Sequence, residues 1–254
     1  MAVVTELIVP RRFRGPSGSG NGGWSAGSLA AHVDPEATAR GVRWPPIEVT
    51  LRRPPPLELP LTVSRAEDAV RLVEPDGQLV AAARVAEKAT EPVPSVPPAT
   101  ARAAEPSYAG HRTHPFPGCF VCGPERAPGD GLRIFPGPVD APGQIAATWT
   151  PTADLDEGPD PEDEPRVGLA VTWAALDCPG GWAGDLTDRM MVLGRITARV
   201  DVLPVVGEPH VVVGAHRGSE GRKTFTASTL YDADGRVVAV AEHVWIAIEP
   251  GSFG

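Results

Sequence analysis

The chain has 254 residues, of which 42% are hydrophobic and 22% charged, and its formal net charge is −9. This length allows one large domain or two small ones. The negative net charge argues against nucleic acid or an anionic membrane surface as the main partner. The N-terminus has no apolar segment of signal-peptide type, no apolar run is long enough to span a membrane, and three cysteines make no disulfide framework. We therefore expect a cytoplasmic protein with reduced thiols.

The first predicted elements are a short strand, TELIVPRRF, and a helix, GGWSAGSLAAHV, that follows a glycine-rich segment. The helix is apolar nearly all round, so we expect it to be buried. Its start exposes backbone N–H groups, which bind anionic or polarised oxygens. The helix itself carries no acid or base, so this segment supplies at most half of an active site.

About four antiparallel strands are expected after this helix, and the last two are joined by an Asp-Gly hairpin at residues 76–77. A proline-rich segment from Glu91 to Pro106 follows. Its composition is typical of a stiff, extended linker between two parts of similar size.

The second half repeats the order of the first. Short strands are expected in GLRIFPG and GQIAATWT, then a buried helix over Arg166–Ala183, then strands that end in a second Asp-Gly hairpin at residues 234–235. A small sheet wrapped around one helix leaves an exposed edge, which pairing with a second such unit removes. We expect an α+β chain with an N-terminal unit over 1–90, a linker over 91–110 and a C-terminal unit over 111–254.

Two segments resemble a known family. The stretch CFVCGPERAPGDGLRIF, followed by a helix with a single acid in WAALDCPGG, resembles the phenylacetate-pathway-type acyl-CoA thioesterases. The stretch NGGWSAG resembles the N-terminal unit of fused double-hotdog thioesterases. The resemblance implies two hotdog units, each a long helix wrapped by a curved antiparallel sheet. It also implies an acyl-CoA thioester hydrolase that needs no cofactor beyond the coenzyme A of its substrate, as a monomer with an internal pseudo-dimer or as a homodimer.

The resemblance also implies the site residues. In the family, a glycine N–H at the helix start polarises the thioester carbonyl, and a carboxylate on the neighbouring unit's helix acts as nucleophile or general base. Asn21, Gly22 and Gly23 match the helix start, and Asp177 matches the acid. The implied site is therefore a composite, with Gly22 from one unit and Asp177 from the other.

The reciprocal positions are Gly168, which has no His or Asn with it, and Ala30, which replaces the acid. Asp177 also stands just before Cys178 and Pro179, and a proline disfavours the helical conformation in the residue before it. An alternative therefore places Asp177 at a helix end, where it makes only a local hydrogen bond. This alternative favours a second function, a non-catalytic acyl or acyl-CoA binding protein of the same fold.

Four further residues are candidates for substrate binding. Arg217, Arg222 and Lys223 lie in a glycine-rich connection between two predicted strands and are candidates to bind the phosphates of coenzyme A. Trp24 is a candidate for the wall of an acyl pocket. The alternatives are a solvated hairpin loop for the three cations and an ordinary core position for Trp24.

His111, His114, Cys119 and Cys122 offer four potential zinc ligands within twelve residues. A zinc knuckle normally draws its ligand pairs from two separated segments, and we find no second pair. We therefore expect no bound metal and a packed pair of reduced thiols, with a zinc site as the alternative.

Overall fold

The computed structural model describes residues 5–40, 42–66, 68–87, 90–157 and 164–249. The first half contains β1 (Thr5–Leu7), η1 (Arg11–Phe13), α1 (Gly22–Ala30), α2 (Pro35–Arg40), β2 (Val42–Leu51), β3 (Leu61–Arg65), β4 (Val70–Val73) and β5 (Leu79–Val85). The connection contains α3 (Pro98–Ala104), η2 (Glu105–Ser107) and η3 (Ala109–His111). The second half contains β6 (Gly137–Pro138), β7 (Gln144–Trp149), η4 (Ala153–Leu155), α4 (Leu169–Ala183), β8 (Met191–Val202), β9 (His210–Glu220), β10 (Lys223–Tyr231) and β11 (Val237–Ala247).

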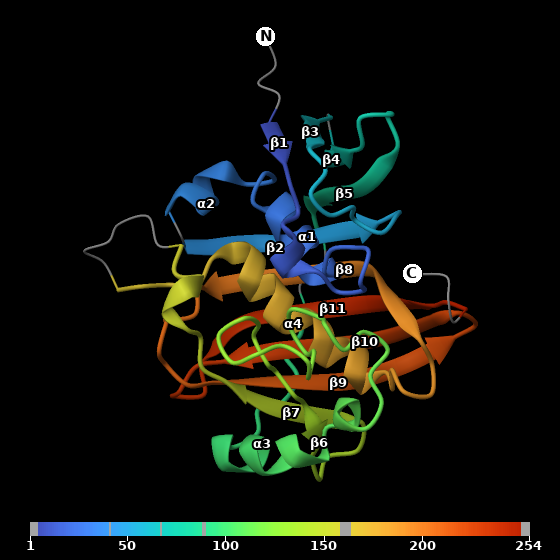
Figure 1. The fold of residues 1–254 in the computed structure, drawn as a ribbon. Coiled ribbons are helices and arrows are strands. Elements are labelled where there is room, and N and C mark those ends of the chain that lie inside the picture. Colours follow the sequence, from blue (N-terminus) through green and yellow to red (C-terminus); the bar gives the residue numbers. More distant parts are fainter. Residues whose placement is uncertain (1–4, 41, 67, 88–89, 158–163, 250–254) are drawn as a thin grey trace.

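The described strands form one antiparallel sheet of eleven strands in the order β1-β3-β4-β5-β2-β8-β11-β10-β9-β7-β6 (Figure 1). The two halves meet where β2 pairs with β8, with Ile47 opposite Ala198 and Val49 opposite Ile196. From this junction the strands follow in equivalent order in both directions. Both Asp-Gly hairpins are present, between β4 and β5 and between β10 and β11. The predicted edge-to-edge pairing of two hotdog units in an α+β chain is confirmed.

Helices α1 and α4 lie side by side against the sheet (Figure 1). They run antiparallel, because Gly23 lies beside Asp177 and Gly27 beside Ala170. A β-carbon on Gly23 would lie 2.5 Å from the Asp177 Cβ, and one on Gly27 would lie 2.7 Å from the Trp173 Cβ and 2.8 Å from the Ala170 Cα. These distances are too short for any side chain, so glycine is what allows the two helix backbones to approach. The contact brings residues from both halves into one core.

The proline-rich connection is not only an extended linker. Residues 91–97 have no regular structure, but α3 follows, because its alanine-rich sequence favours a helix and Pro98 suits the first helical position. The Val93 N–H donates to Thr229 Oγ1 at 2.8 Å, and Tyr231 donates to the Val93 carbonyl. Val211 and Val213 of β9 pack with this segment, whereas Val212 between them packs in the main core. The segment therefore covers the sheet face opposite α4, and we propose to count it with the second unit.

Two predicted strands are shorter than expected. The first stretch forms a strand only over Thr5–Leu7, makes one isolated bridge between Val9 and Leu57, and then turns into η1. In the second, GLRIFPG, the Leu132 and Ile134 N–H groups donate to the carbonyls of Phe120 and Val121, at 2.9 Å each, instead of joining the sheet. Within the described residues, no helix is long and apolar enough to cross a membrane.

Candidate active site

The site is built at the start of α1. Asn21 caps the helix, and its Oδ1 accepts a hydrogen bond from the Trp24 N–H at 2.8 Å. Its Nδ2 donates to Asp177 Oδ2 at 2.9 Å, and the Gly23 N–H donates to the same oxygen at 2.9 Å. A capped helix start from the first unit therefore holds the acid of the second unit by two hydrogen bonds.

Asp177 does not lie at a helix end. Helix α4 continues through Pro179 to Ala183, so the alternative in which the proline ends the helix is wrong. A proline inside a helix removes one backbone hydrogen bond. Ser228 of β10 donates to the neighbouring Leu176 carbonyl at 2.7 Å, so the sheet supplies a polar contact to this part of the helix.

The environment of Asp177 suits proton transfer. Burial raises the pKa of its carboxyl to about 7, while the hydrogen bonds from Gly23 and Asn21 act in the opposite direction. Its second oxygen, Oδ1, is buried and has no hydrogen-bond partner among the described residues. A carboxyl with such a pKa exchanges its proton readily near neutral pH.

A pocket of about 230 Å³ opens onto this acid. Asn21, Gly22 and Asp177 line it together with two sets of neighbours. The polar or charged set is Ser19, Arg52, Arg53, His114, Cys119, Cys122 and Cys178, and the apolar set includes Leu51, Phe116, Leu186, Met191, Leu193, Trp245 and Ile246. Gly22 is the first residue of α1, and within the described residues its N–H has no acceptor. The pocket therefore combines a helix-start N–H with a buried carboxylate oxygen.

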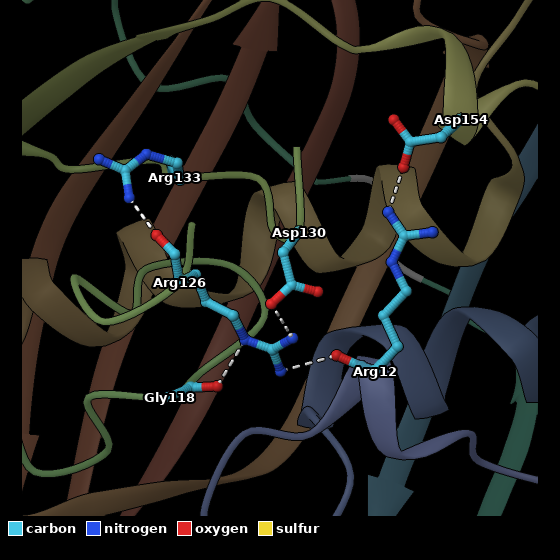
Figure 2. Close-up of polar contacts among 6 residues, drawn as sticks. All are labelled: Arg12, Gly118, Arg126, Asp130, Arg133 and Asp154. Atoms are coloured by element: carbon cyan, nitrogen blue, oxygen red, sulfur yellow. Dashed lines mark hydrogen bonds and ion pairs between the residues drawn. The ribbon is translucent and has the colours of Figure 1, made fainter. Parts of the chain in front are cut away.

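Arg126 holds the segment that carries Cys119 and Cys122 against the first unit (Figure 2). Its buried guanidinium donates to the Gly118 carbonyl at 2.8 Å and to the Arg12 carbonyl at 2.8 Å, and it pairs with Asp130 at 3.1 Å. Arg12 in turn pairs with Asp154, and Arg133 donates to the Arg126 carbonyl. This network fixes one wall of the pocket.

A third thiol, outside the predicted set of ligands, joins Cys119 and Cys122 in this wall. Cys178 follows Asp177 on α4, and its Sγ lies 3.7 Å from the Cys119 Sγ. Hydrogen bonds from the thiols of Cys122 and Cys178 lower the pKa of Cys119. The position of Cys178 next to the predicted acid was the available signal, because neighbours of a site residue on a buried helix lie close to the same pocket.

The predicted substrate-binding residues are not among those that line the pocket. Trp24 is buried and stacks on Phe13, with ring centroids 4.3 Å apart. Arg217 lines a different cavity, and Arg222 donates to the Ala247 carbonyl at the end of β11. Lys223 is exposed at the start of β10.

Two other cations do line the pocket. Arg52 and Arg53 follow β2, and both are exposed at the pocket. Arg53 is 3.5 Å from Glu74. Sequence reasoning missed this pair, because only the fold brings the end of β2 to the start of α1.

The reciprocal helix start differs from the first. Gly168 caps α4 without a side chain that accepts a hydrogen bond. A β-carbon on Gly168 would lie 1.9 Å from Glu157 Oε2, so the Glu157 carboxylate occupies the space beside this helix start. Ala30, at the position equivalent to the acid, is fully buried. Of these two helix starts, as far as the described residues show, that of α1 alone combines a capping amide with an acid from the other helix.

The fold and the shared pocket define the class of the chain, which is a double-hotdog protein. Among solved structures it is similar to the acyl-CoA thioesterase II TesB2 from Mycobacterium marinum, with a TM-score of 0.56, 14% identity, and coverage of 97% of this chain and 93% of that one. It is similar to the tesB protein of Mycobacterium avium subspecies paratuberculosis, with a TM-score of 0.54, 12% identity, and coverage of 92% and 89%.

A third similar structure is a conserved protein of unknown function with a hotdog fold from Alicyclobacillus acidocaldarius. Its TM-score is 0.52, its identity 13%, and the match covers 97% of this chain and 93% of that one. No protein-family model and no curated protein matches the sequence. At these identities the likeness establishes the double-hotdog fold of thioesterase II structures, and the chemistry has to be argued from the site.

Proposed function

We propose that the protein hydrolyses an acyl-CoA thioester at one composite site between its two units. The observation that carries this proposal is that the unpaired Oδ1 of Asp177 and the N–H of Gly22 belong to residues that line the same pocket. One of the similar structures is named an acyl-CoA thioesterase II and another a tesB protein, and these names support the same class of reaction. The exposed cations Arg52 and Arg53 at the pocket suit the phosphates of coenzyme A.

In the proposed mechanism the thioester carbonyl oxygen accepts a hydrogen bond from the Gly22 N–H. Negative charge develops on that oxygen as the carbonyl carbon becomes tetrahedral, and one such preorganised donor is worth about 3 kcal/mol. Asp177 takes the proton of a water that attacks the carbonyl carbon. The carbon–sulfur bond then breaks, and the proton passes from Asp177 to the leaving thiolate. Direct attack by Asp177, with an anhydride intermediate, is the other route open to this carboxylate.

The acyl group should be small. The pocket volume of about 230 Å³ lies below the roughly 300–1,000 Å³ typical of sites for drug-sized ligands. The wall of the pocket as a whole is largely apolar, so we propose a short, uncharged acyl chain.

The test is the substitution Asp177→Asn, assayed with a series of acyl-CoA thioesters. Because the amide still accepts the two hydrogen bonds but cannot take a proton, kcat should fall by about 100-fold or more, while acyl-CoA binding persists. The matched control is Glu157→Gln, which makes the same change beside the reciprocal helix start and should leave kcat unchanged. Equal activity of wild type and Asp177→Asn would refute the proposal. Tight acyl-CoA binding without turnover in the wild type would instead identify a binding protein.

A further inference from the structure

The three cysteines of the chain form one buried cluster beside the pocket. Cys119 and Cys122 come from the CFVCG segment and Cys178 from α4, and all three are buried. Their sulfur atoms all lie within 4.8 Å of one another, and the Cys119 and Cys178 sulfurs are 3.7 Å apart. Three sulfurs bound tetrahedrally to one ion at 2.3 Å would be about 3.8 Å apart. The cluster therefore has close to the spacing that a thiolate-bound ion requires.

The segment that carries the first two cysteines is held on both sides. The Gly123 N–H donates to the Cys119 carbonyl at 3.0 Å, which closes a tight turn. Arg126 fixes the Gly118 carbonyl just before the turn. The two sulfurs are thus positioned by the backbone before any ion is present.

Side-chain N–H donors surround the sulfurs as well. Asn21 Nδ2 lies 3.9 Å from the sulfurs of both Cys119 and Cys178. His114 Nδ1 accepts from the Phe116 N–H at 2.9 Å, so its Nε2 carries the proton. That nitrogen lies 3.1 Å from the Cys122 carbonyl oxygen and 3.4 Å from the Cys122 sulfur. His114 is therefore a donor to Cys122 and not a metal ligand. Donors of this kind stabilise negatively charged sulfur around a metal.

We propose that Cys119, Cys122 and Cys178 bind one Zn²⁺ ion as three thiolates. Binding releases the three thiol protons. One Zn²⁺ and three neutral thiols thus give a zinc–trithiolate complex with a net charge of −1, and the three protons pass to solvent. Thiolates select soft or borderline metals such as zinc. The fourth position is taken by a water from the pocket that all three cysteines line. This revises the expectation of a metal-free pair, because Cys178 is the further ligand that the spacing of the first segment does not contain.

The test uses untagged, fully reduced protein from which metal has been removed by a chelator. Titration with Co²⁺ should produce thiolate-to-cobalt charge-transfer absorption that saturates at one ion per chain and disappears when Zn²⁺ is added. The protein as purified should contain about one zinc per chain by elemental analysis. Neither readout depends on thioester hydrolysis. The zinc site can therefore be refuted without refuting the proposed function, and the reverse also holds.

Two variants test whether Cys178 is a ligand. Cys178→Ser removes the α4 ligand and should weaken Co²⁺ binding by more than about 10-fold, whereas His111→Ala, an exposed histidine of the original candidate set, should not change it. A folded, reduced wild type that shows no charge-transfer absorption in excess Co²⁺ would overturn the proposal, whether or not the variants fold. Equal Co²⁺ affinity in wild type and Cys178→Ser would also overturn it.

Discussion

At the scale of single residues, Asn21 uses the two ends of one amide for two tasks. Its oxygen caps α1 at the Trp24 N–H, and its nitrogen donates to Asp177. An aspartate at this position would keep the cap but place a second carboxylate against the first. The amide is therefore what allows one residue to start the helix and hold the acid.

This predicts different outcomes for two substitutions of Asn21. Asn21→Asp should keep the cap but lose most hydrolysis, because two facing carboxylates raise the pKa of the pair and push Asp177 toward its protonated form. The raised pKa also costs stability near neutral pH, and this loss should shrink as the pH falls. Asn21→Ala should lose activity and also about 1 kcal/mol of stability, because the cap is gone. Thermal unfolding and steady-state kinetics on both variants check this. Wild-type activity in Asn21→Asp would contradict it.

His243 predicts how stability depends on pH. Burial lowers the pKa of this fully buried histidine to about 4, below the value of about 6.5 in an unfolded chain. Between pH 4 and 6.5 the unfolded state therefore binds more protons than the folded state. The contribution of neutral, buried His243 to the free energy of unfolding is complete above pH 6.5. It is lost as the pH falls to 4, and the loss is about 3 kcal/mol in total. Asp177 acts in the opposite direction, because its raised pKa costs stability as the pH rises toward 7.

The measurement is the free energy of unfolding of wild type and His243→Asn between pH 4 and 7. The difference between the two curves isolates the histidine, because both proteins keep Asp177. The stability advantage of wild type should shrink as the pH falls. A difference that stays constant over this range would show that His243 is not held neutral in the folded chain.

At the scale of elements, the contact between α1 and α4 depends on small residues. Gly27→Ala should lower the free energy of unfolding by about 1–2 kcal/mol, because the added methyl group meets Trp173 and the α4 backbone, and this outweighs the gain in helix propensity. Ser28→Ala is the matched control on the same helix and should change stability by less than about 0.5 kcal/mol. Chemical denaturation of both variants checks this. A Gly27→Ala protein more stable than wild type would contradict the close approach.

The same elements show what the sequence can predict. Local pattern and the repeat predicted the two helices and the two Asp-Gly hairpins. The match of Asn21 and Asp177 to a helix start and its acid came from the resemblance to a known family. The packing of residues 91–106 on the outer sheet face was not, because proline-rich composition does not say what a segment covers. The sequence also did not predict that Cys178 lies close to Cys119 or that Arg52 lines the pocket. Both depend on how elements far apart in the sequence pack together.

At the scale of the whole molecule, the two units should unfold together. Strand β2 is hydrogen-bonded to β5 of its own unit and to β8 of the other, and α1 and α4 share one core. Removing either unit would expose a sheet edge and an apolar helix face. We expect one calorimetric transition for the full chain, with equal calorimetric and van't Hoff enthalpies. Two resolved transitions, or cooperative folding of residues 1–90 alone, would contradict this.

The difference between the two helix starts also determines how many ligand molecules one chain binds. A symmetric dimer of identical units would present two equivalent centres, and ligand binding at one would be free to alter the affinity of the other. In this chain Gly168 and Ala30 stand where the second centre would need a capping amide and an acid. On the proposed function, one chain binds one equivalent of a non-hydrolysable thioester analogue. Its saturation curve is then a simple hyperbola with a Hill coefficient of about 1.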